Sequence, residues 1–208
     1  LVFNDGFNGA KQALAYVEGV RDMLNQGGSK TQVTVKWDGA PAIVCGTDPE
    51  DGKFFVGTKS VFSNDPKMVK TKKNLDDWYA GSGLYDILGQ ALALFPKLNI
   101  GTVLQGDLLF GAQRMPTSES IDGEDYLAFR PNTITYAVKQ GTDLAKRIST
   151  AKMGIVFHTT YTGPTVAEMK ADFGANITGL AQTPDVWVED AYYNDYTGHA
   201  TLSDQENA

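Results

Sequence analysis

The sequence predicts an α+β protein in which twisted, mostly antiparallel sheets carry helices on their outer side. Several short segments alternate polar and apolar residues or are almost wholly apolar, as strands are. Other segments repeat apolar residues every three or four positions, as amphipathic helices do. A dense turn signal at Asp48–Gly52 joins two of the strand segments directly, which favours an antiparallel hairpin.

Start and stop signals mark the helices, and residue alternation marks the strands. The predicted helices span residues 7–25 before Gly27-Gly28, 74–95 between a cap at Asn74 and Pro96, 142–152, and 165–174 after a Thr165–Glu168 capping box. The predicted strands span residues 31–35, 42–45, 53–58, 102–110, 133–138, 153–161 and 186–193. Residues 111–125 are expected to form a loop.

Composition predicts an ordinary globular chain. Its 208 residues contain no internal repeat and no linker, so we expect one domain over residues 1–208. The formal net charge of −7 argues against a protein that coats nucleic acid with its whole surface. Cys45 is the single cysteine, and no leader and no run of about eighteen apolar residues is present. We therefore expect a cytoplasmic protein in which Cys45 is a buried thiol.

The stretch Val33–Gly39, read as Val-Thr-Val-Lys-Trp-Asp-Gly, contains the candidate nucleophile Lys36. Lys36 continues the alternation of residues 31–35, and Asp38-Gly39 supplies turn chemistry, which predicts a lysine at the lip of a hairpin. Covalent lysine chemistry requires a site that lowers the lysine pKa by desolvation or by nearby positive charge. Taken alone, Lys-x-Asp-Gly is a short motif that favours a surface hairpin with a solvated lysine.

Two other residues are candidate partners of Lys36. Lys59 follows the strand that pairs across the Asp48–Gly52 turn, where a second cation is suited to hold a phosphate. The alternative for Lys59 is a solvated lysine on an edge strand. Asp107 interrupts the apolar strand 102–110, where an unpaired acid is costly to bury. Asp107 is expected to meet a cation or ribose hydroxyls, or else to face solvent.

The remaining polar signals are weaker. His158 and His199 are the only histidines, too few for a histidine-rich zinc site, and no phosphate loop or serine-nucleophile motif occurs. We interpret His158 as a strand histidine satisfied by its neighbours. Residues 53–73 contain six lysines against one acid. The candidates there for guiding a polynucleotide backbone are Lys67, Lys70, Lys72 and Lys73, with a solvated loop as the alternative.

The order of these pieces resembles the covalent nucleotidyltransferases, which include the ATP-dependent DNA and RNA ligases and the mRNA capping enzymes. Lys36-Trp37-Asp38-Gly39 looks like their adenylation motif, and the later spacing is most similar to phage-type RNA ligases. The later pieces are Gly57-Thr58-Lys59-Ser60, Gln105-Gly106-Asp107, Pro131-Asn132-Thr133-Ile134 and Met153-Gly154-Ile155-Val156-Phe157. The resemblance covers roughly residues 33–161 and implies an ATP-grasp-like adenylation domain with a nucleotide between its sheets.

The resemblance also implies roles. Lys36 would attack ATP to form a lysine–AMP linkage, with Mg²⁺ offsetting phosphate charge. The implied nucleotide contacts are Val35, Asp38, Gly39, Lys59 on phosphate, Asp107 on ribose or metal, and Phe157 stacked on adenine. The AMP would pass to a polynucleotide end, RNA more than DNA, in the cytoplasm of a virus-infected bacterial cell. The family's later Glu-Gly strand and closing Lys-x-Lys strand are not found in this sequence, and they would lie beyond Ala208 if the sequence is a fragment.

Two other hypotheses remain open. The chain is alternatively a relative that binds nucleotide or nucleic acid without turnover. It is otherwise a viral accessory or structural protein in which Lys-Trp-Asp-Gly is only a hairpin.

Overall fold

The computed structural model describes residues 2–26 and 35–193. The chain divides into two compact units, one made of Leu1–Val35 with Tyr193–Ala208 and the other of Lys36–Tyr192. In the first unit, the predicted helix is α1 (Val2–Gln26), with a non-helical backbone at Gly6. The predicted strand at residues 31–34 falls outside the described residues. No described helix is both long and apolar enough to span a bilayer.

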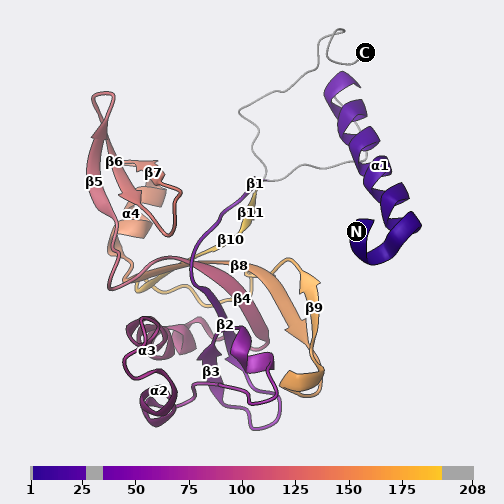
Figure 1. The fold of residues 1–208 in the computed structure, drawn as a ribbon. Coiled ribbons are helices and arrows are strands. Elements are labelled where there is room, and N and C mark those ends of the chain that lie inside the picture. The colour runs from indigo at the N-terminus through magenta and orange to yellow at the C-terminus, as the bar shows by residue number, and fades with distance from the viewer. Residues whose placement is uncertain (1, 27–34, 194–208) are drawn as a thin grey trace. The chain divides into compact units, whose positions relative to one another are not determined.

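The second unit is built on a six-stranded sheet with the order β10-β8-β4-β2-β3, and β9 pairs with β8 (Figure 1). The strands are β2 (Ala42–Thr47), β3 (Phe54–Gly57), β4 (Val103–Phe110), β8 (Met153–Thr162), β9 (Lys170–Phe173) and β10 (Val186–Asp190). All neighbours are antiparallel except β8 and β10. The α+β prediction and the hairpin of β2 and β3 are therefore confirmed.

Helices α2 (Lys72–Tyr79) and α3 (Tyr85–Leu94) cover one face of this sheet, followed by the short turn η2 (Phe95–Leu98). Their buried side chains, such as Leu88 and Ala91, form one core with sheet residues that include Cys45. Cys45 is fully buried as predicted, and burial raises the pKa of its thiol. One helix was predicted here, but Thr71 caps α2 separately and Asn74 lies inside its first turn.

A second, three-stranded sheet consists of β5 (Thr117–Ile121), β6 (Glu124–Phe129) and β7 (Tyr136–Lys139), and α4 (Asp143–Thr150) lies beside it (Figure 1). Phe129 and Ile148 from this layer pack with Phe110 and Trp187 from the main sheet. The loop prediction for residues 111–125 was wrong over β5, whose mostly exposed residues lack the apolar alternation of a half-buried strand.

Four short elements remain. β1 (Val35–Lys36) pairs with β11 (Tyr192–Tyr193), so Lys36 does not lie on the predicted hairpin. The turn η1 (Lys59–Phe62) follows β3. Thr165 caps only the turn η3 (Val166–Glu168), and β9 follows where the sequence predicted a helix to residue 174.

Candidate functional site

The Lys-Trp-Asp-Gly segment links β1 to the main sheet and runs beside β4. The Ala40 N–H donates to Leu108 O and the Leu108 N–H donates to Pro41 O, both at 3.0 Å. One residue later, Ala42 pairs with Asp107 across β2 and β4. These bonds fix the segment next to Asp107, and the side chain of Lys36 reaches that carboxylate.

Lys36, Asp107 and His158 form one contact cluster. The Lys36 ammonium donates to Asp107 Oδ2 at 2.9 Å and to Trp37 O at 3.3 Å. The other carboxylate oxygen, Oδ1, lies 3.5 Å from His158 Nε2. The Lys36 side chain is 34% exposed, against 11% for Asp107 and 13% for His158. The lysine thus reaches the surface above a carboxylate and an imidazole that are mostly buried.

Two opposing effects set the pKa of Asp107. Burial alone would raise this pKa, because a carboxylate loses hydration in the interior. The contacts with His158 and Lys36 outweigh burial and hold the pKa of Asp107 below its ordinary value. Asp107 is therefore ionised at neutral pH and balances the charge of Lys36.

A polar strip crosses this face of the sheet between two apolar clusters. Along β4, Val103 belongs to one cluster and Leu109 to the other, whereas Gln105 and Asp107 lie between them. The Tyr161 hydroxyl donates to Gln105 Oε1 at 2.7 Å. Gln105 and Tyr161 had no predicted role, and His158 was predicted to be a strand histidine satisfied by its neighbours. The sequence signal for this strip is the pair Gln105 and Asp107, two polar residues at alternate positions in an otherwise apolar strand.

The second sheet holds the motif loop through Asp38. Asn132 Nδ2 donates to Asp38 Oδ2 at 2.7 Å. The Tyr136 hydroxyl accepts from the Asp38 N–H at 2.7 Å and donates to the Asp38 carbonyl at 3.0 Å. Trp37 packs against Tyr136, with ring centroids 4.7 Å apart. The Pro131-Asn132 piece of the resemblance therefore meets the Lys-Trp-Asp-Gly piece directly.

The other predicted nucleotide contacts differ in position. Gly39 lies in the loop beside β4, and Val35 belongs to β1, although its side chain falls outside the described residues. Lys59 is exposed in η1, directly after β3. Gly57, at the end of β3, pairs with Val44 near the start of β2. Lys59 therefore lies near the same end of the sheet as Asp107, and β2 separates β3 from the strand of Asp107.

Phe157 requires a correction. Its side chain is fully buried in the helix-covered core, whereas its neighbour His158 contacts Asp107. Val156, the residue before Phe157, packs in the cluster that contains Trp37, and successive residues in the regular part of the strand point to opposite faces, so Phe157 faces away from the Lys36 side of the sheet. From this position Phe157 does not stack on a nucleotide held at Lys36.

In the predicted basic run, three of the four lysines are paired with acids. Lys70 Nζ contacts Asp48 at 2.6 Å and Asp51 at 2.9 Å. Lys72 and Lys73 pair with Asp76 and Asp77 along α2. Of the four candidates, only Lys67 has no side-chain ion pair with a described residue. The acids that flank the counted window neutralise most of its charge.

Asp107 is a weak candidate metal ligand, because both of its oxygens already face nitrogen donors. Within residues 2–26 and 35–193, no three His, Cys, Asp or Glu side chains are grouped for a metal ion. Mg²⁺ is commonly held by substrate phosphates together with one or two carboxylates.

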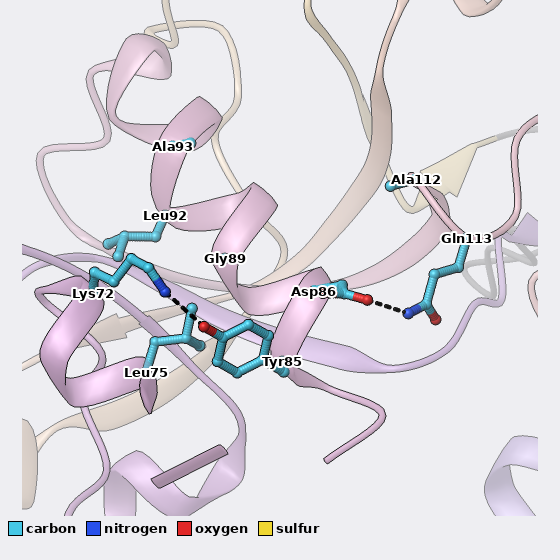
Figure 2. A pocket seen from close by; sticks show the side chains of 9 residues that line it. All are labelled: Lys72, Leu75, Tyr85, Asp86, Gly89, Leu92, Ala93, Ala112 and Gln113. Carbon is cyan, nitrogen blue, oxygen red and sulfur yellow. Dashed lines mark hydrogen bonds between the residues drawn. The ribbon is translucent and has the colours of Figure 1, made fainter. Parts of the chain in front are cut away.

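A separate cavity of about 730 Å³ lies over α2 and α3 (Figure 2). Leu75, Leu92 and Ala93 contribute its apolar wall. Two polar pairs border it, with Lys72 donating to the Tyr85 hydroxyl at 2.6 Å and Gln113 donating to Asp86 at 2.8 Å. Neither Lys36 nor Asp107 lines this cavity.

Fold and site together define an α+β protein with a lysine, a carboxylate and an imidazole clustered on one face of a mixed sheet. The chain belongs to a protein family described as a family of unknown function (DUF6267), which it matches over residues 1–208. No curated protein and no solved structure matches the chain.

Proposed function

We propose that this chain is an ATP-dependent adenylyltransferase of the polynucleotide ligase type, with an ATP-grasp-like adenylation fold and Lys36 as its nucleophile. The observation that supports this proposal is the convergence of three distant segments. Lys36 contacts Asp107, and Asp38 contacts Asn132, across 71 and 94 residues of sequence. A solvated lysine on a surface hairpin would require neither contact.

The proposed first step joins Lys36 to AMP. The nitrogen lone pair of the neutral amine attacks the α-phosphorus of ATP, and an N–P bond forms. The bond from that phosphorus to the bridging oxygen breaks, and pyrophosphate leaves with the oxygen. The protons lost by the amine pass to solvent. An oxygen of a 5′-phosphate end, RNA more than DNA, then attacks the same phosphorus, the N–P bond breaks, and Lys36 leaves as the amine after taking up a proton from solvent. A 3′-hydroxyl finally attacks the phosphorus of the 5′-phosphate, loses its proton to solvent, and releases AMP.

The residues of the cluster would position the reactants. Asp107 holds the amine at a fixed place, and the Asn132 and Tyr136 bonds hold the adjoining loop. Lys59 would contact phosphate from the same end of the sheet. Mg²⁺ bound together with ATP would neutralise part of the phosphate charge. The protein would act in the cytoplasm of a virus-infected bacterial cell.

A labelling experiment tests this function. The wild-type chain is incubated with Mg²⁺ and α-³²P-ATP or α-³²P-GTP, denatured, and analysed for radioactive protein. We expect acid-labile label from ATP in the wild type and none in Lys36→Ala. The control is Lys53→Ala, which should label fully, because it removes a surface lysine whose side chain is 70% exposed. Label that survives in Lys36→Ala would contradict the proposal.

One observation favours a binding-only relative as the second candidate. Phe157, to which the resemblance assigns the stacking on adenine, is buried in the helix-covered core and not on the Lys36 side of the sheet. ATP binding measured by calorimetry without covalent label would support this second candidate. Absence of both binding and label would favour the accessory or structural hypothesis.

A further inference from the structure

His158 occupies an irregular position in β8. Gln105 of β4 pairs with Thr159, and the next residue, Gly106, pairs with Phe157, so the register skips His158. This is a β-bulge, which changes the direction of a side chain and shifts the alternation of faces that follows. Because of the bulge, His158 and Tyr161 both contact the polar strip, although they are three residues apart.

Gly106 brings β4 close to the bulge. A Cβ atom at Gly106 would lie 2.5 Å from Val156 O and 2.8 Å from Phe157 Cδ1, closer than real Cβ contacts. Only glycine therefore permits this approach of the two strands. The close approach occurs one residue before Asp107, and it brings the carboxylate within reach of the imidazole.

The ring of His158 is itself held in place. His158 Nδ1 is hydrogen-bonded to the Thr159 hydroxyl at 2.7 Å, which leaves Nε2 facing Asp107 Oδ1 at 3.5 Å. Asp107 Oδ2 then faces the Lys36 ammonium at 2.9 Å. The contacts form a chain from Thr159 through His158 and Asp107 to Lys36, and its inner members are mostly buried.

We propose that His158 is a positioning residue, which fixes the rotation of the Asp107 carboxylate and thereby the place of the Lys36 amine. This inference rests on the proposed function, since the amine that is placed is the proposed nucleophile. His158 does not touch the reacting atoms in this arrangement. It contacts the carboxylate from behind, with Nε2 3.5 Å from Asp107 Oδ1, and the bulge gives the side chain this direction.

The first test measures the amine without ATP. The intact protein is treated with a small N-hydroxysuccinimide acetate reagent at one fixed pH, and acetylation of Lys36 is followed by peptide mass spectrometry. The pairing with Asp107 shields the amine, so we expect Asp107→Asn and His158→Leu each to accelerate acetylation about fivefold, the effect of losing one partly exposed ion pair. Acetylation of Lys53 serves as the internal control and should not change.

Two further variants separate positioning from general damage. His158→Gln keeps an N–H donor at a similar reach and is expected to restore the wild-type rate of Lys36 acetylation. Adding His158→Leu to Asp107→Asn should have no further effect, because the proposed role operates only through Asp107. A Thr159→Val variant, which leaves His158 in place, should accelerate acetylation partially.

The second test uses the labelling reaction with ATP. His158→Leu should lower the rate of label formation at saturating ATP about tenfold while the KM for ATP stays within twofold, because the nucleophile and not the nucleotide is misplaced. An unchanged acetylation rate in His158→Leu, or additive effects in the double variant, would overturn the positioning role. Absence of label in the wild type would count against the proposed function alone, since the acetylation test does not depend on ATP.

Discussion

At Gly39 the backbone of β4 leaves no space for a side chain. A Cβ atom there would lie 2.4 Å from Leu108 O and 2.9 Å from Leu109 Cδ2. We expect Gly39→Ala to destabilise the protein by about 3 kcal/mol, the cost of forcing atoms into a packed site. Urea unfolding measures this change. Gly83→Ala is the matched control, because a Cβ atom there has no neighbour within 4 Å.

The Gly39 comparison also bears on how the motif is read. If Gly39→Ala and Gly83→Ala have equal stabilities, the loop does not lie against β4 as described. If only Gly39→Ala is destabilised, packing against β4 is enough to require glycine at position 39, independently of any nucleotide. Motif residues then need tests of chemistry, such as labelling of Lys36, in addition to tests of folding.

Single residues show where sequence reasoning succeeds and where it fails. An acid inside an apolar strand predicted that Asp107 would meet a cation or ribose hydroxyls unless it faced solvent, and in the structure it pairs with Lys36. The same reasoning did not find His158, because a bulge depends on pairing between distant strands and has no local signal in β8. The resemblance supplied Phe157 as a stacking residue, but strand alternation places it in the opposite core.

At the scale of elements, Lys70 ties the β2–β3 turn to the segment before α2. The Asp48 side chain is only 3% exposed, and Lys70 lies 2.6 Å from it. We expect Lys70→Met to destabilise the protein by about 3 kcal/mol, because the variant leaves a buried carboxylate without its cation. Urea unfolding at neutral pH provides the measurement.

The control for Lys70 is Lys73, whose side chain is 80% exposed and pairs with Asp77 one helical turn away. Lys73→Met should cost no more than about 0.5 kcal/mol. Equal effects of the two substitutions would show that Lys70 is an ordinary surface lysine. In that case Lys70 would again be a candidate for contact with a polynucleotide backbone.

Elements with local signals were predicted well, whereas pairings between distant elements were not. The turn residues Asp48–Gly52 predicted the β2–β3 hairpin, because turn chemistry acts over a few residues. The turn at Asp38-Gly39 looked similar, but β1 pairs with β11 from the other end of the unit. Likewise, the charge of the lysine run was counted without Asp48 and Asp76, which lie outside the counted window and neutralise it.

At the scale of the whole molecule, ion pairs make the fold sensitive to acid. Several carboxyl groups have pKa values below their ordinary range because cations or hydrogen bonds stabilise the charged form: Asp51, Asp76, Asp107, Glu119, Glu124 and Asp185. Each binds a proton more readily in the unfolded chain. The stability that these groups contribute is therefore present above about pH 4 and is lost as the pH falls below that value.

Asp185 provides the sharpest test of this acid sensitivity. Hydrogen bonds from Lys152 and Lys97 lower the pKa of Asp185 to about 2. The stability difference between wild type and Asp185→Asn should be constant above about pH 5 and should shrink as the pH falls from about 4 toward about 2. Urea midpoints across this range measure it, with the exposed Asp143→Asn as control. A difference that does not vary with pH would contradict the assignment.

The position of the large cavity over α2 and α3 has a practical consequence for inhibitor discovery. A compound that binds in this cavity would contact its apolar wall and its two polar pairs (Figure 2). Such compounds would leave the lysine on the other face of the sheet free to react. Competition with an amine-directed reagent would sort compounds into two classes before any activity is assayed, provided that modification of Lys36 is followed separately from that of Lys72, which borders the cavity.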